Sequence, residues 1–86
     1  MFVYLGKDTV IRASSIIAII NWEAVEGSEN NHLFLKKAQT KELVRDIAGG
    51  KPHSMVITPN AVYLSSVSST TLKKRAENPH YQAWDT

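Results

Sequence analysis

An apolar run at residues 15–22 constrains the fold of this chain most strongly. Within it, Ile16, Ile17, Ile19 and Ile20 place apolar side chains on both alternating faces of an extended backbone. Isoleucine is β-branched, which favours a strand over a helix. A strand that is apolar on both faces must be covered from both sides. The sequence therefore predicts a buried strand with other elements packed on either side of it.

Short β-rich segments bounded by turn residues surround this run. Gly6-Lys7-Asp8 predicts a hairpin turn near the start of the chain, and Pro59-Asn60 predicts a second one. Residues 43–47 could prolong a preceding helix or form a strand, and we favour a strand. The predicted strands are residues 2–5, 9–12, 15–22, 43–47, 54–58 and 61–65.

Two helices are predicted from capping residues and apolar spacing. Ser28 can cap a helix over residues 29–39, on which Phe34, Leu35 and Ala38 form a narrow apolar stripe. Ser68 and Ser69 can cap a second helix over residues 70–77, on which Leu72 and Ala76 face the core and which Asn78-Pro79 terminates.

These elements predict an α+β fold. Because most connections are short, we expect a strongly bent antiparallel sheet or partial barrel of five to six strands, with a central helix and a C-terminal helix. The length of 86 residues predicts one domain at residues 1–78, followed by a tail at residues 79–86 in which Trp84 is a candidate for an intersubunit contact.

Composition narrows the class of protein. A domain of this size buries only ~60–65% of the surface of its unfolded chain, so an isolated monomer would be marginal and subunit association is expected. The sequence contains no cysteine, which excludes disulfides and thiolate metal sites. The longest apolar run, Ile16 to Ile20, is far shorter than the ~20 residues of a membrane span. Since no secretion signal is recognisable either, we expect a cytoplasmic protein with no membrane association.

The residues that could carry catalysis are poorly arranged for it. His32, His53 and His80 are widely spaced, and no serine has the context of a nucleophile elbow. Gly49-Gly50-Lys51 lacks the spacing of a phosphate-binding loop. We therefore expect neither an enzyme nor a metal or cofactor site.

Basic residues offer two interpretations. The formal net charge is only +2, but Lys73-Lys74-Arg75 form a block near the end of the predicted last helix. Such cations complement the helix dipole and solvate the surface, or they contact phosphates, and the residues alone favour the first reading. Lys51 and His53 lie in or beside a glycine-rich loop, where a side chain can reach a phosphate more readily.

Several segments together resemble the RemA/RemB extracellular matrix regulatory proteins of bacteria, with the greatest similarity to the RemB branch. The likeness covers residues 2–76 and is carried by Phe2-Val3-Tyr4-Leu5-Gly6, Ile16-Ile17-Ala18-Ile19, Pro52-His53-Ser54-Met55-Val56-Ile57-Thr58, Val62-Tyr63-Leu64-Ser65 and Ser68-Ser69-Thr70-Thr71-Leu72-Lys73-Lys74-Arg75-Ala76.

The resemblance implies a cytoplasmic, oligomeric DNA-binding regulator of extracellular matrix, or biofilm, gene expression. Such a protein assembles into a ring whose repeated basic loops contact the phosphates of double-stranded DNA, with weak sequence preference. Lys51 matches the position of the family's basic loop. The wider set of candidate nucleic-acid-binding residues is Lys51, His53, Arg12, Lys73, Lys74 and Arg75.

The sequence departs from the RemA pattern at that loop. RemA proteins carry two adjacent arginines before the strand that begins here at Ser54, whereas this chain has Gly50-Lys51-Pro52-His53. RemA also has an arginine at the start of its long apolar strand, where this chain has Ser14 and Ser15. These departures support an alternative function, namely an oligomeric adaptor or assembly protein of the same fold that binds a protein partner rather than DNA.

Overall fold

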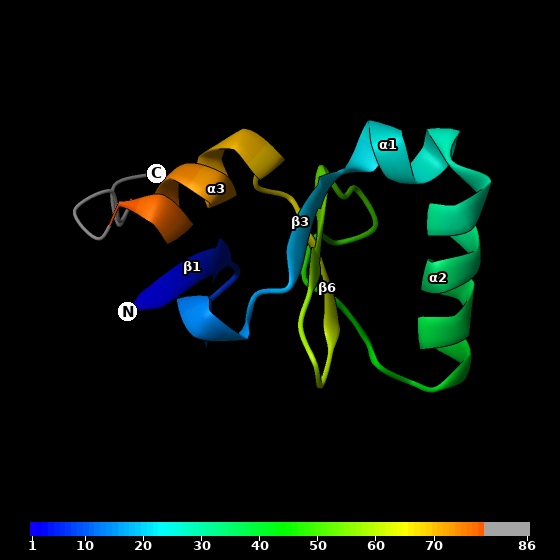
Figure 1. The fold of residues 1–86 in the computed structure, drawn as a ribbon, viewed down its shortest axis with the longest axis horizontal. Helices are drawn as coiled ribbons and strands as arrows, with labels where there is room; N and C mark the ends of the chain where they lie inside the picture. The colour runs from blue at the N-terminus through cyan, green and yellow to red at the C-terminus, as the bar shows by residue number, and fades with distance from the viewer. Residues whose placement is uncertain (79–86) are drawn as a thin grey trace.

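The structure, a computed structural model, describes residues 1–78, and they form the predicted mixture of strands and helices (Figure 1). Within these residues the elements are β1 (Phe2–Gly6), β2 (Thr9–Arg12), a 3-10 turn (Ala13–Ser15), β3 (Ala18–Asn21), α1 (Trp22–Gly27), α2 (Glu29–Thr40), β4 (Val44–Asp46), β5 (Ser54–Ile57), β6 (Val62–Ser65) and α3 (Ser69–Glu77). The predicted tail and Trp84 lie outside the described residues. Within residues 1–78, no helix has the length and apolar character that crossing a membrane requires.

The strands form two sheets rather than one. β1 and β2 make an antiparallel hairpin of their own, and the other four strands are ordered β3-β5-β6-β4. β4 is parallel to β6, with Val44 opposite Val62, whereas the other pairs are antiparallel. The prediction of a single bent antiparallel sheet or partial barrel is thus wrong in its topology. β5 already pairs with β3 along one edge and β6 along the other, and β4 joins the sheet at the free edge of β6.

The four-stranded sheet is covered on both faces, as the apolar run at residues 15–22 predicts. On one face Val25 of α1 and Leu35 of α2 pack against Met55, with Ile20 beside them. On the other face Ile19 packs in a second cluster, to which the hairpin contributes Val3 and Leu5, β5 contributes Val56 and α3 contributes Leu72. Figure 1 shows these layers, with α1 and α2 on one side of the sheet and the β1–β2 hairpin and α3 on the other.

The strand that forms from this apolar run lies at the edge of the sheet and is shorter than predicted. β3 begins only at Ala18, although the amide of Ile17 still donates to the carbonyl of Ile57 at 2.7 Å. It ends at Asn21, whose side chain accepts from the amide of Glu23 at 2.8 Å and so caps α1. α1 was therefore not predicted from the sequence, because Trp22 was assigned to the strand although it is the first residue of this helix.

The other local predictions agree with the structure. Ser28 and Ser68 cap α2 and α3 by accepting from the backbone amides three residues later. The predicted hairpin at Pro59-Asn60 joins β5 to β6, and Thr58 closes its turn with hydrogen bonds to the backbone of Ala61. Phe34 is the exception, because it is 40% exposed while its neighbour Leu35 is buried.

Candidate nucleic-acid interface

The loop between β4 and β5 presents Lys51 on a tight glycine turn. Gly49 and Gly50 have φ angles of +64° and +85°, a backbone conformation that favours glycine. A Cβ at either position would have no neighbour within 4 Å, so the backbone conformation and not space requires glycine here. The amide of Lys51 donates to the carbonyl of Ala48 at 3.3 Å, and its side chain is exposed. The loop thus holds one cation in solvent on a defined turn.

His53 fixes the end of this loop to the sheet through its backbone. Its amide donates to the carbonyl of Ser65 at 2.8 Å, and its carbonyl accepts from the amide of Trp22 at 3.1 Å. The next residue, Ser54, donates its hydroxyl to the carbonyl of Val67 at 2.8 Å. The side chain of His53 itself is exposed. Lys51 and His53 therefore lie at the end of the sheet where β6 leads into α3.

The hairpin turn before β2 reaches the same end of the molecule. The hydroxyl of Ser65 donates to the carbonyl of Leu5 at 2.6 Å, which holds the end of β1 against the end of β6. Lys7, two residues after Leu5, is exposed and borders a shallow hollow of about 370 Å³ that Ser66 and Thr71 also line. Lys7 was not among the candidate residues predicted from the sequence. Nothing in the local sequence around Lys7 indicates this position, because the hydrogen bond that holds β1 here joins Leu5 to Ser65, 60 residues away along the chain.

The remaining candidate residues are divided between this end and other surfaces. Lys73 and Lys74 are exposed on α3, which begins directly after this end of the sheet (Figure 1). Arg12 is exposed at the far end of β2, opposite Phe2 and away from the hairpin turn, where its guanidinium carbon lies 5.6 Å from the centre of the Phe2 ring. The structure therefore does not bring Arg12 together with Lys51.

Arg75 differs from its two basic neighbours because it is only 1% exposed. Its Nη1 donates to the carbonyl of Tyr4 at 2.8 Å, and its guanidinium carbon lies 5.6 Å from the centre of the Tyr4 ring. This placement argues against the prediction that Arg75 contacts a phosphate, because the guanidinium instead ties α3 to β1. A signal for it exists in the sequence, since Arg75 follows Leu72 by three residues and so shares its inward-facing side of the helix.

Acidic residues modify the potential at this end of the molecule. Glu23 and Glu26 are exposed on α1, and α1 begins at Trp22, which is hydrogen-bonded to His53. Glu23 directly follows Trp22, so its charge offsets part of the positive potential at this end, and a single copy offers a phosphate only a weak attraction. Among residues 1–78, no three His, Asp or Glu side chains lie close enough together to hold a metal ion.

Comparison with known proteins places this chain in a family. The family described as RemA-like, extracellular matrix regulatory protein A-like, matches residues 2–76. The chain is also 39% identical over 77 residues to extracellular matrix regulatory protein B of Bacillus subtilis (strain 168), a match that covers 90% of this chain and 91% of that protein. The chain therefore belongs to the RemA-like family of extracellular matrix regulatory proteins.

Proposed function

We propose that this protein is an oligomeric DNA-binding regulator of extracellular matrix gene expression. The observation that carries the proposal is the exposed Lys51 on its glycine turn, at the end of the sheet that Lys7 also reaches. Lysine on a loop is suited to phosphate contacts, because a loop can follow the backbone of a DNA duplex. The name of the related protein from Bacillus subtilis supports the regulatory role. With DNA as its target, the protein acts in the cytoplasm.

The small charge of the chain requires that the contacts be repeated. The formal net charge is +2, and only a few cations of each copy lie at the proposed interface. A ring of copies places the same loop against successive phosphates, so that weak contacts add through their effective concentration. Contacts of this kind are steeply salt-dependent and discriminate between sequences mainly through the ease with which DNA bends.

Fluorescence anisotropy with a labelled duplex, titrated at several salt concentrations, tests the proposal. Lys51→Ala and Lys7→Ala should each weaken binding about fivefold or more and reduce the slope of log K against log salt, because each variant removes one phosphate contact per subunit. Lys36→Ala is the matched control, since Lys36 is an exposed lysine on α2, on the other side of the sheet from the hairpin. Absence of binding to any duplex at low salt contradicts the proposal.

Binding of a protein partner is the second candidate function. It is favoured by an open apolar groove beside α2, lined among others by Ile17, Phe34 and Ile57, which a phosphate backbone would not fill. In this case the variants at Lys51 and Lys7 should leave partner binding unchanged, because their charge lies on another surface.

A further inference from the structure

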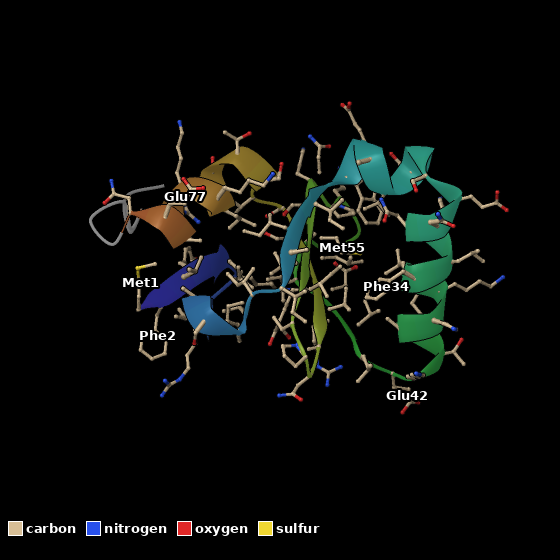
Figure 2. The ribbon with its side chains drawn as sticks, in the orientation of Figure 1. Met1, Phe2, Phe34, Glu42, Met55 and Glu77 are labelled. Carbon is tan, nitrogen blue, oxygen red and sulfur yellow. The ribbon has the colours of Figure 1, made fainter. Side chains whose placement is uncertain are left out.

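An open apolar groove lies between α2 and the turn of the β5–β6 hairpin. Its volume is about 280 Å³, and its walls include Ile17 before β3, Phe34 on α2, Leu43 before β4, and Ile57 and Pro59 on the hairpin. Figure 2 shows Phe34 projecting from α2 into the space on the sheet side of the helix. The floor is formed by Ala38 and Val62, which belong to the core beneath it. The groove is therefore a break in the cover of the sheet, at the opposite end of β5 from Lys51.

The two walls of the groove are unusually exposed for apolar side chains. Ile17 is 65% exposed and Phe34 is 40% exposed, and both border the same hollow. Apolar side chains that are scattered singly over a surface need no explanation, but these two border one hollow, and apolar grooves with polar rims are a feature of partner-binding surfaces. The volume is just below the ~300–1,000 Å³ typical of pockets that enclose a small ligand. It suits one large apolar side chain of a partner better than an entire small molecule.

The rim of the groove is positively charged. Lys37 and Lys41 both line it and both are exposed. Lys37 lies on the last turn of α2, and Lys41 is the residue that caps this helix, with its amide donating to the carbonyl of Lys37 at 3.1 Å. A segment that places an apolar side chain in the groove therefore meets two cations at its edge, and carboxylates on that segment would be complementary to them.

The charge of the rim also bears on whether a second copy fills the groove. Another exposed apolar side chain, Phe2 of the β1–β2 hairpin, lies at the opposite end of the long axis of the molecule (Figure 2). Arg12 lies against the Phe2 ring. Docking of this hairpin into the groove of another copy would bring Arg12 towards Lys37 and Lys41, and like charges oppose such a contact.

We propose that this groove binds an acidic segment of a protein partner. A large apolar side chain of the segment inserts between Ile17 and Phe34, and its carboxylates pair with Lys37 and Lys41. This site goes beyond the DNA contacts proposed above. Because it lies at the other end of β5 from Lys51, a partner and a duplex can be bound at the same time. The regulator would thus have a protein-binding site that is separate from its DNA-binding surface.

Binding of a model peptide to the full chain tests the proposal. The probe is a fluorescein-labelled peptide of about twelve residues in which Glu alternates with Leu and Phe, and its counterpart carries Lys in place of Glu. Phe34→Ala and the double variant Lys37→Glu/Lys41→Glu should each weaken binding of the acidic peptide about tenfold or more. Leu33→Ala and Lys36→Glu are matched controls, because both residues are exposed on α2 but neither lines the groove. They should leave the affinity within about twofold of the original.

Each outcome decides for or against the acidic partner. Selective binding of the acidic peptide, lost in the groove variants and retained in the controls, supports it. Equal binding of the basic peptide, or no effect of Phe34→Ala, overturns it. If the acidic peptide does not bind and Phe34→Ala instead reduces the sedimentation coefficient of the protein, a second copy occupies the groove and the proposal is wrong. DNA titration of the same variants separates this result from the proposed DNA binding, which predicts unchanged affinity when Phe34 is replaced.

Discussion

Replacement of Arg75 by Met tests the role that its burial assigns to it. Methionine keeps a long apolar stem but removes the guanidinium, which is 1% exposed and donates to the carbonyl of Tyr4 at 2.8 Å. A hydrogen bond from a charged group contributes about 1.5–3 kcal/mol, and the contact with the Tyr4 ring adds about 0.5–2 kcal/mol when it is shielded from water. Since methionine recovers part of the packing, we expect Arg75→Met to lower the free energy of unfolding by about 2–4 kcal/mol.

Urea unfolding followed by far-ultraviolet circular dichroism measures this loss. A chain of this size has an m-value of about 1 kcal/mol/M, so the midpoint should fall by about 2–4 M urea. A small domain has a total stability of only ~5–15 kcal/mol, so the variant should be close to the limit of folding at room temperature. Lys74→Met is the matched control, because Lys74 is exposed one residue earlier on the same helix, and its effect should stay below about 0.5 kcal/mol.

Two results would refute the reasoning about Arg75. One is a loss of stability no larger than that of Lys74→Met, which would mean that the contact with Tyr4 contributes nothing measurable. The other is a loss of DNA affinity with stability unchanged, which would restore Arg75 to the phosphate-contacting set that the sequence predicted.

Three further substitutions test other parts of the structure. Ser65→Ala removes two hydrogen bonds between a fully buried hydroxyl and the backbone, so it should lower the free energy of unfolding in urea by about 2–3 kcal/mol. An equal loss for the exposed control Ser66→Ala would count against this role of Ser65. Gly6→Ala should lower the free energy of unfolding by about 1 kcal/mol or more because φ at Gly6 is +105°, whereas Gly27→Ala, in open space, should raise it by about 0.5 kcal/mol. A change of the same sign for both variants would refute the argument from backbone conformation. Glu23→Gln should raise DNA affinity about two- to fivefold in anisotropy titrations at low salt, and unchanged affinity would place DNA elsewhere.

Much of the fold follows from local patterns in the sequence. Of the isoleucines at residues 16–20, Ile16 and Ile19 pack in one cluster and Ile20 in the cluster on the other face, whereas Ile17 stays exposed. Ser28 and Ser68 cap helices because a hydroxyl can satisfy a free amide of the first turn, which is a purely local interaction. The β5–β6 hairpin is equally local, since its turn residues and both of its strands are contiguous.

The features that the sequence did not predict depend on long-range contacts or on competing local signals. The parallel pairing of β4 with β6 joins strands that are not consecutive in the chain, so the local pattern of residues 43–47 specifies neither the partner nor the direction. Trp22 fits a strand and a helix equally well by its type, and the cap provided by Asn21 decides in favour of the helix. For the candidate site, the glycine loop in the sequence predicts Lys51 and His53. Lys7 reaches the same end of the sheet through the hydrogen bond between Ser65 and Leu5, which no local pattern indicates.

Sedimentation velocity at micromolar protein concentration, with and without duplex DNA, tests the proposed function most directly. An oligomeric DNA-binding regulator should sediment as a multimer alone, and it should form a faster species with the duplex at low salt that disappears as salt is raised. Lys51→Ala should form less of this protein–DNA species, whereas Lys36→Ala should form as much of it as the original protein. A monomer whose sedimentation is unaffected by any duplex would contradict both the assembly and the DNA binding.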